Sequence, residues 1–306
     1  MSAAAAARIL LLGADGQLGT ELRRSLAPLG TIVPATLSGA LGGESCERAD
    51  FAEPGSLPAL VDRVAPDMVV NAAAHTAVDR AEQERDLAWR INAEAPGALA
   101  QACVRRGAWL VHYSTDYVFD GRGTRPYRED DEPDPPGVYG ASKLAGEEAV
   151  RASGARHLLF RTAWVYAAHS HNFLRTMLRL GAERDVLRVV ADQVGTPTPA
   201  PLIADVTAHA LRHLPAHPGT WHLTATGQTS WHGFAEAIFA GAVARGLLQR
   251  APRVEPIATA DYPTPAARPA YSVLDTTRLR ADFGIGLPSW QDGLGRVLDE
   301  LGGHAG

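Results

Sequence analysis

A short apolar run that leads into a glycine-rich turn constrains the fold of this chain more than any other stretch. Ile9–Leu12 is a continuous apolar run, typical of a buried parallel strand. Gly13–Gly19 follows it with the sequence GADGQLG, and leucines then recur at the helical spacing of Leu18, Leu22 and Leu26. The glycines allow a tight turn and let backbone approach a pyrophosphate, and the start of the helix supplies free N–H groups. Strand, glycine-rich turn and helix together predict a dinucleotide-binding unit.

Four further strands are predicted downstream. A long helix is expected from about 78 to 106 with an interruption near Pro96, and the strands are expected at Thr31–Ala35, Asp67–Val70, Ala108–Tyr113 and Leu158–Arg161. Strands that alternate with helices at this spacing predict an α/β fold, a Rossmann-type doubly wound parallel sheet. In such sheets the ligand lies at the carboxyl ends of the strands. The following segments should therefore meet in one crevice with the glycine-rich turn: Ala74–Thr76, Ser114–Asp116 and Thr162–Trp164.

The alternation of strands and helices loosens after Tyr166. Proline becomes frequent in Thr196–Pro201 and again in Pro252–Pro269. We therefore expect a smaller C-terminal substrate-binding lobe that covers the crevice. The NAD(P)-binding Rossmann domain is predicted to span 1–165 together with about 190–214, and the lobe to span 166–189 and 215–306.

Composition excludes several classes of protein. The 306 residues are 46% hydrophobic, enough for a sizeable core, and the net charge of −5 suggests neither a nucleic-acid partner nor an anionic membrane surface. Two cysteines are too few for a disulfide framework, so we expect a reducing cytoplasm. Met1–Ala7 is an alanine-rich tract without a basic region before it, so it is expected to be a frayed terminus and neither a signal peptide nor a membrane span.

A single lysine stands among the 29 Lys and Arg residues of the chain. This residue, Lys143, lies four positions after Tyr139 in the stretch VYGASKLAGE. On a helix the two side chains would share a face, and a nearby ammonium lowers the pKa of a phenol, which makes it a usable proton donor or acceptor. The alternative is a surface tyrosine beside a solvated lysine. The use of arginine at every other basic position disfavours this alternative, because a lone lysine suggests a site that needs a compact charge.

Three patterns bear on cofactor choice and metals. Thr36 stands where an NAD-preferring unit carries an acid for the ribose hydroxyl, so NADPH should serve at least as well as NADH. His209 and His213 have helical spacing, but Ala210 stands where a zinc protease has glutamate, so they are expected on a helix surface. The acidic run Glu129–Asp134 is expected to be a solvated surface and not a metal site.

The motifs together resemble the extended short-chain dehydrogenase/reductase family. They extend from near the N-terminus to about Arg268, so the resemblance covers nearly the whole chain. HYSTDYVF and YPTPAARP are specific to one branch, the reductases of a dTDP-linked 4-keto sugar. The full set reads GADGQLG, VVNAAAHTAVDRAE, VHYSTDYVFDG, VYGASKLAGE, FRTAWVYA, NFLRTMLRL, DQVGTPT, TWHLTATGQTSW and YPTPAARP.

The resemblance implies a role for individual residues. Tyr139 would protonate the C4 oxygen of the sugar as hydride arrives, Lys143 would lower the pKa of Tyr139 and bind the nicotinamide ribose, and Thr115 would orient the substrate carbonyl. The cofactor, NADPH or NADH, is expected to contact Gly13, Gly16, Gln17, Leu18, Asp50, Phe51, Ala74, His75, Thr76, Tyr113, Tyr139 and Lys143. The sugar nucleotide is expected to contact Thr115, Asp116, Tyr139, Trp164 and Arg268.

The implied activity is reduction of the C4 ketone of dTDP-4-dehydro-β-L-rhamnose, the last step of dTDP-L-rhamnose synthesis. Some family members bind Mg²⁺ through carboxylates at a subunit contact. Glu21 matches one of these, but Pro201 stands where another would be, so we expect no metal and either a monomer or a homodimer.

Two alternatives remain open. One is another nucleotide-sugar reductase or epimerase of the same fold. The other is a catalytically silent regulatory subunit, against which the intact set of Thr115, Tyr139 and Lys143 argues.

Overall fold

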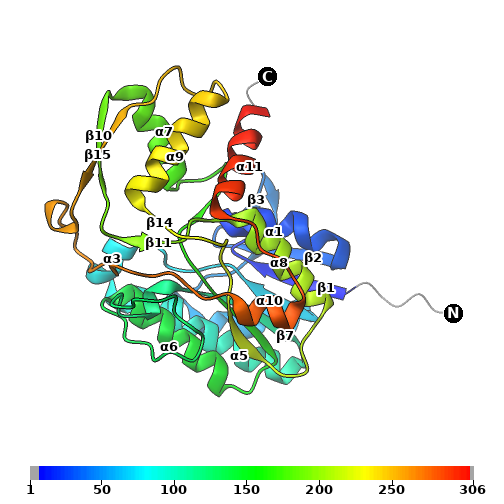
Figure 1. Cartoon of the computed structure of the whole chain (residues 1–306). Coiled ribbons are helices and arrows are strands. Elements are labelled where there is room, and N and C mark those ends of the chain that lie inside the picture. Colours follow the sequence, from blue (N-terminus) through cyan, green and yellow to red (C-terminus); the bar gives the residue numbers. More distant parts are fainter. Residues whose placement is uncertain (1–6, 304–306) are drawn as a thin grey trace.

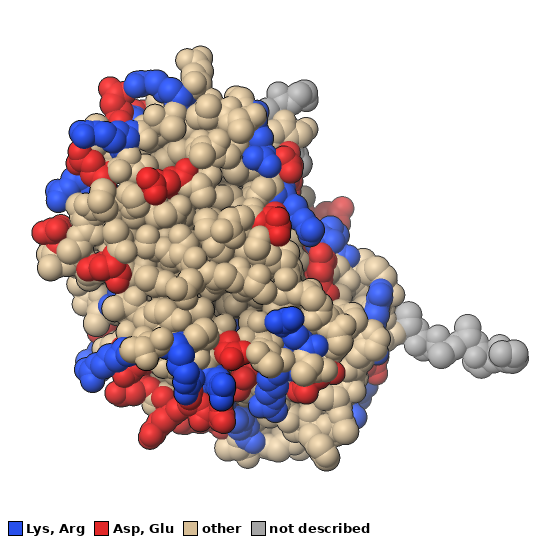
Figure 2. Space-filling model, in the orientation of Figure 1, with Lys and Arg blue, Asp and Glu red and all other residues tan. Residues whose placement is uncertain are grey.

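The computed structural model describes residues 7–303 and shows a larger half that contains a central sheet and a smaller lobe beside it (Figure 1). Apart from Ala7, the expected frayed terminus lies outside the described residues. Within the described part, no helix has both the length and the apolar character needed to cross a membrane. Basic and acidic side chains are interspersed over the lower part of the face shown in Figure 2, so neither sign of charge forms a continuous patch there.

Seven parallel strands form the central sheet in the order β13-β8-β7-β6-β1-β2-β5. After β2 and β5 on one side of β1, the chain returns to β6 on the other. The strand order therefore reverses between β1 and β6, where doubly wound sheets open a ligand crevice. The strands are β1 (Ala7–Leu12), β2 (Gly30–Thr36), β5 (Glu47–Arg48), β6 (Met68–Asn71), β7 (Trp109–Thr115), β8 (His157–Thr162) and β13 (Gly219–His222).

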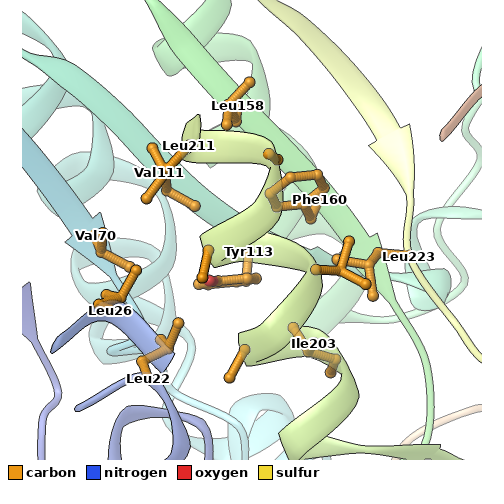
Figure 3. Packing of buried hydrophobic residues seen from close by; sticks show 14 of the residues in the cluster. Leu22, Leu26, Val70, Val111, Tyr113, Leu158, Phe160, Ile203, Leu211 and Leu223 are labelled. Atoms are coloured by element: carbon orange, nitrogen blue, oxygen red, sulfur yellow. The ribbon is translucent and has the colours of Figure 1, made fainter. Parts of the chain in front are cut away.

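Helices cover both faces of this sheet. Successive side chains of a strand point to opposite faces, so Ile9 and Leu11 join one apolar cluster while Leu10 and Leu12 join the other. The first face packs on α1 (Gln17–Leu26) and α8 (Ala200–Arg212), and the second on α2 (Leu57–Val64), α5 (Ala95–Arg106) and α6 (Val138–Ala152). Figure 3 shows the first cluster, with Leu22, Leu26, Ile203 and Leu211 packed against Val70, Val111, Tyr113 and Phe160. The predicted Rossmann-type fold is confirmed.

The single long helix expected from 78 to 106 is instead a series of short ones. It consists of α3 (Val78–Gln83), α4 (Arg85–Trp89), a π-helical turn η3 (Arg90–Glu94) and α5. The first break, at Glu84, was not expected. The interruption expected near Pro96 is the π-helical turn η3, which ends just before α5 begins. Pro96 lies in the first turn of α5, where its missing N–H costs nothing.

The smaller lobe has its own apolar core. Tyr166, Leu174, Phe234, Phe239 and Trp290 are buried together in it. Its elements are α7 (Phe173–Glu183), α9 (Trp231–Ala244), α11 (Trp290–Gly303) and the parallel pair β10 (Val186–Val190) and β15 (Arg253–Ile257).

The predicted boundary of the lobe at 215 differs from the structure in two places. β13 is the edge strand of the central sheet, and α10 (Thr277–Phe283) buries Leu279 and Phe283 in the first apolar cluster. Because β13 has only four residues, its apolar pattern is too short to identify from sequence. The remaining short elements are η1 (Ala27–Leu29), β3 (Ala40–Leu41), β4 (Glu44–Ser45), η2 (Pro54–Ser56), η4 (Asp116–Val118), β9 (Val165–Tyr166), β11 (Val194–Gly195), β12 (Thr198–Pro199), β14 (Thr229–Ser230) and η5 (Thr259–Asp261).

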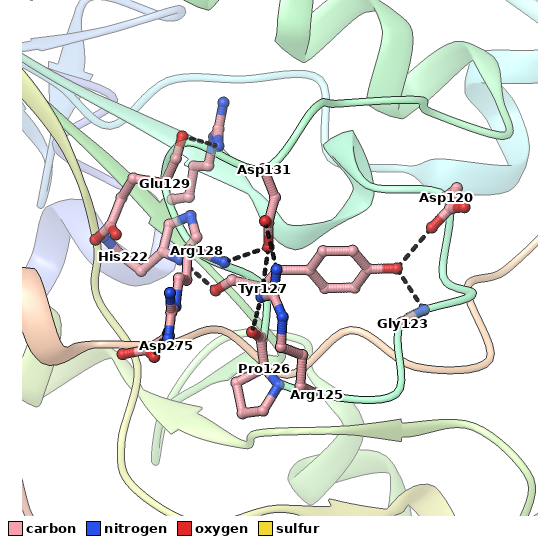
Figure 4. Close-up of polar contacts among 11 residues, drawn as sticks. Asp120, Gly123, Arg125, Pro126, Tyr127, Arg128, Glu129, Asp131, His222 and Asp275 are labelled. Carbon is pink, nitrogen blue, oxygen red and sulfur yellow. Dashed lines mark hydrogen bonds and ion pairs between the residues drawn. The ribbon is translucent and has the colours of Figure 1, made fainter.

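The acidic run Glu129–Asp134 was expected to be a solvated surface, but two of its carboxylates make specific hydrogen bonds. Asp131 binds both terminal nitrogens of Arg125, and these hydrogen bonds lower the pKa of Asp131 to about 2. Glu129 accepts the backbone N–H of His222 at 2.9 Å, and burial raises the pKa of Glu129 (Figure 4). Glu129 therefore ties the long loop to β13, while Asp130 and Asp134 are exposed as predicted.

A buried ion pair fixes α6 to β8. Glu147 is fully buried and receives three hydrogen bonds from Arg161, from Nε to Oε1 at 2.9 Å and to Oε2 at 3.2 Å, and from Nη2 to Oε2 at 2.7 Å. Burial alone would raise the pKa of Glu147, but the hydrogen bonds and charge of Arg161 outweigh it and hold that pKa below its usual value.

We expect Glu147→Ala to lower the free energy of unfolding by about 3–5 kcal/mol, because Arg161 would remain buried without its partner. Urea denaturation measures the effect. Glu148→Ala removes the exposed neighbouring carboxylate and should change stability by about 0.5 kcal/mol or less. Equal losses in the two variants would contradict a special role for the buried pair.

Candidate active site

A cleft of about 1110 Å³ lies at the carboxyl edge of the sheet and is lined by both halves of the molecule. Fifteen of the sixteen residues predicted from sequence to contact cofactor or substrate line it, and His75 does not. Those that do are Gly13, Gly16, Gln17, Leu18, Asp50, Phe51, Ala74, Thr76, Tyr113, Thr115, Asp116, Tyr139, Lys143, Trp164 and Arg268. The predicted convergence of strand ends is therefore present.

The glycine-rich turn leaves backbone exposed to the cleft. Gly13 has φ of 72°, and a Cβ there would lie 2.8 Å from the backbone nitrogen of Ala73. A Cβ on Gly19 would lie 2.0 Å from the carbonyl oxygen of Gly13. The turn can thus pack this tightly against α1 and the end of β6 only without side chains. It presents backbone at the N-terminus of α1, a combination that fits the pyrophosphate of a dinucleotide.

The segment after β2 offers no acid to a ribose. Thr36 is buried, and its hydroxyl accepts the N–H groups of Gly39 and Ala40 and closes the turn. The acids that line the cleft are Asp15, Asp50 and Asp116, none of them from this segment. Because the end of β2 carries no carboxylate, the cleft is compatible with both NADPH and NADH.

His75 does not line the cleft, and Nε2 of its ring lies 3.2 Å from Oε2 of Glu84. The backbone of His75 is held by a contact that the sequence did not reveal. Its backbone N–H donates to Oδ1 of Asn92 at 2.9 Å, and its carbonyl accepts Nδ2 of Asn92 at 3.0 Å. Nδ2 of Asn92 also donates to Ser142 of α6. Asn92 thus joins the turn at Ala74–Thr76 to the helix that carries Tyr139. No sequence motif marked it, since it is one buried amide within a helical stretch.

Lys143 lies buried and Tyr139 half-buried at the cleft, in α6 as predicted. Nζ of Lys143 donates to the carbonyl oxygen of Tyr113 at 2.6 Å, and burial lowers the pKa of Lys143 to about 8 against the opposing charge of Glu147. The expectation that Lys143 lowers the pKa of Tyr139 is wrong for this structure. Burial raises the pKa of Tyr139, and only the hydrogen bond with Thr115 opposes the shift. The phenol is therefore a protonated acid throughout the neutral range.

Thr115 and Asp116 follow Tyr113 at the end of β7. The hydroxyl of Thr115 donates to Oδ1 of Asp116 at 3.0 Å. Asp116 is 2% exposed, and burial raises its pKa to about 6. Oδ2 of Asp116 makes no hydrogen bond of normal geometry with the described residues, although the Ser272 side chain lies close enough to oppose the rise in the pKa of Asp116. A buried carboxylate oxygen at the cleft can accept a hydroxyl group of a ligand.

Trp164 and Arg268 bring the lobe into contact with the cleft. The ring of Trp164 stacks on Trp231 with centroids 3.5 Å apart and planes 5° apart. Trp164 also has φ of 47°, which is rare for a bulky residue and marks functional sites. Arg268 is ion-paired with Asp79 at 2.7 Å. Trp231 and Asp79 were not identified as site residues from sequence, although both lie inside matched motifs.

The residues considered for metal binding have other partners. Glu21 pairs with His169 at 2.8 Å, and Pro201 lies in the first turn of α8. Nε2 of His209 donates to the carbonyl oxygen of Phe283, and its ring stacks on His213. Residues 7–303 contain no group of three His, Cys, Asp or Glu residues arranged to hold a metal ion.

A glycine-rich turn at the switch point of a Rossmann sheet, with a half-buried tyrosine and a buried lysine one helical turn apart, defines a nicotinamide-dependent oxidoreductase of the short-chain type. The chain belongs to the family described by the RmlD substrate binding domain, whose model matches residues 7–302.

Relatives of known name agree with this assignment. A dTDP-4-dehydrorhamnose reductase of Burkholderia thailandensis is 50% identical over 303 residues, covering 96% of this chain and 99% of the relative. A dTDP-4-dehydrorhamnose reductase of Salmonella typhimurium is 46% identical over 296 residues, covering 96% and 97%.

Solved structures agree as well. A dTDP-4-dehydrorhamnose reductase of Bacillus anthracis in complex with NADP superimposes with a TM-score of 0.87 at 37% identity, covering 96% of this chain and 99% of that one. A UDP-glucose 4-epimerase of Thermus thermophilus in complex with NAD has a TM-score of 0.77 at 20% identity, covering 96% and 98%, and shows the shared fold alone.

We expect Lys143→Arg to reduce kcat by about 100-fold or more, because a guanidinium does not fit the buried space that receives Nζ. Steady-state kinetics measure the loss, and an unchanged melting temperature would show that the fold is retained. Arg151→Lys, on the exposed end of the same helix, is the matched control and should keep full activity. Near-normal turnover of Lys143→Arg would remove Lys143 from the mechanism.

The pH dependence of kcat/KM should reflect the ionisation of Lys143. Since the pKa of Lys143 in the free protein is about 8, its ammonium is lost as pH rises through that value. We expect kcat/KM to be level between about pH 6, where the Asp116 carboxylate titrates, and pH 8, and to fall above pH 8 with Tyr139 still protonated. Rates measured in buffers of constant ionic strength test this. A profile that stays level well beyond pH 9, with the protein still folded, would contradict it.

Proposed function

We propose that this protein reduces the C4 ketone of dTDP-4-dehydro-β-L-rhamnose to dTDP-β-L-rhamnose with NADPH or NADH, the last step of dTDP-L-rhamnose synthesis. The observation that carries the proposal is the single cleft that Gly13, Thr115, Tyr139, Lys143 and Arg268 line together. The names of relatives up to 50% identical support the identity of the sugar nucleotide.

The proposed chemistry divides between cofactor and protein. A bound NADPH or NADH supplies the hydride. Tyr139 donates the proton to the C4 oxygen, for which a phenol that burial keeps protonated is suited. Thr115 forms a hydrogen bond with Tyr139 and orients the carbonyl oxygen of the substrate toward the proton of Tyr139. Lys143 holds its charge beside the carbonyl of Tyr113 and binds the nicotinamide ribose.

The remaining cleft residues would hold the two ligands. The backbone at Gly16, Gln17 and Leu18 meets the pyrophosphate, and Asp50 and Phe51 the adenine. Ala74 and Thr76 border the cofactor site.

The sugar nucleotide is bound on the lobe side of the cleft. Asp116 accepts a sugar hydroxyl at Oδ2, Trp164 presents its ring to the deoxy sugar, and Arg268 meets the diphosphate.

Product analysis tests this function. Purified protein incubated with the 4-keto sugar and either NADPH or NADH should yield dTDP-β-L-rhamnose by NMR, with NADPH at least as efficient in kcat/KM because no acid lines the end of β2. Inversion at C3 or C5 without net reduction would instead indicate an epimerase. Tight NADPH binding without turnover would indicate a regulatory subunit.

We further propose a cytoplasmic location, which suits a chain with two free cysteines, Cys46 and Cys103, in its described part. The protein acts as a monomer or homodimer without a required metal ion, and its partners are the dinucleotide and the dTDP-sugar.

A further inference from the structure

Asp79 uses both carboxylate oxygens to hold the loop that carries Arg268. Oδ1 accepts the backbone N–H of Ala266 at 3.2 Å, and Oδ2 accepts Nη2 of Arg268 at 2.7 Å. Asp79 lies in the first turn of α3 in the Rossmann half, whereas Ala266 and Arg268 belong to the proline-rich segment that was assigned to the lobe. One side chain therefore joins the two halves beside the cleft, which Val78 and Arg268 both line.

The far end of this loop is fixed by backbone contacts. Pro269 lies so close to Gly121 that a Cβ on the glycine would be 2.4 Å from the Cα of Pro269. The N–H of Tyr271 donates to the carbonyl oxygen of Gly121, and the N–H of Val194 donates to that of Ala270. The near end is exposed, since Tyr262 is 59% accessible. Asp79 holds the stretch between these ends, so the direction of the Arg268 side chain depends on it.

The contact leaves Arg268 available to a ligand. A guanidinium has five N–H donors, and the hydrogen bond to Asp79 uses a donor on Nη2. Arg268 also lies close to Tyr117, whose ring packs edge-on against that of Tyr139 at 5.7 Å. The two charges of the pair cancel at a distance, and both side chains are partly exposed. The pair therefore adds little attraction for an anion and little stability, and its main effect is on geometry.

We propose that Asp79 is a positioning residue that presents Arg268 to the diphosphate of the sugar nucleotide. The proposal rests on the proposed function, because it needs a ligand with that diphosphate. Holding a long, rotamer-rich side chain in its binding orientation before the ligand arrives removes an entropic cost of binding. Asp79 acts only through Arg268 and the Ala266 turn, and it touches no reacting atom. Because α3 directly follows the turn at Ala74–Thr76, Asp79 on α3 also sets the distance between Arg268 and that turn.

Kinetics of Asp79→Asn test the positioning role. The amide keeps the size of the side chain but loses the charge that orients Arg268. We expect KM for the dTDP-sugar to rise roughly threefold to tenfold, with kcat and KM for NADPH unchanged. Asp79→Glu restores the charge and should recover part of the loss. Asp86→Asn, which alters an exposed acid on the next helix, is the matched control and should behave as the unchanged protein.

Four results would overturn the proposal. A lower KM for the sugar in Asp79→Asn would mean that Asp79 merely neutralises Arg268. A parallel change in both KM values together with a lower melting temperature would mean a general structural role. Calorimetric titration with dTDP separates this proposal from the function on which it rests. If the unchanged protein binds NADPH but not dTDP, both fail, whereas equal dTDP binding by the unchanged protein and Asp79→Asn removes only the positioning role.

Discussion

The parallel direction of all seven strands is the constraint on which the rest of the structure depends. Because every strand leaves the sheet at the same edge, side chains far apart in the sequence meet there without long excursions of the chain. Thr115 ends β7 and Trp164 follows β8, while the glycine-rich turn leaves β1 at the point where the strand order reverses. The paired strands β7 and β8 place Thr115 directly beside Thr162. The site is thus a consequence of the sheet, and loops only complete it.

Burial determines the protonation of the two central side chains. Desolvation favours the neutral form of each group, so it raises the pKa of Tyr139 and lowers that of Lys143. Lys143 therefore loses its proton at a lower pH than Tyr139 does, and the phenol stays an acid wherever the ammonium is present. A lysine can hold its charge in such a place because its three donors are compact, and one of them reaches the Tyr113 carbonyl.

Features that depend on local pattern were predictable from the sequence, and those that depend on distant contacts were not. The strand at Ile9–Leu12 and the helix around Tyr139 follow from apolar period and turn residues, and the meeting of strand ends follows from parallel topology. Asn92 was missed because its partners, His75 and Ser142, lie 17 and 50 residues away. The expected pKa of Tyr139 was wrong because helical spacing predicts a shared face but not the depth at which that face is buried. His75 lies outside the cleft because its ring contacts Glu84, nine residues away, which no motif indicated.

Trp164 shows how the two halves constrain each other. Its backbone follows β8 of the central sheet and is held at φ of 47°, a conformation that costs about 1–3 kcal/mol for such a residue. Its ring stacks on Trp231 at the start of α9, with ring centroids 3.5 Å apart. Gly195 lies so close to the ring that a Cβ there would be 2.5 Å away. The unusual backbone of Trp164 persists because its ring is packed against Trp231 of the lobe. The same contact holds the lobe over the cleft.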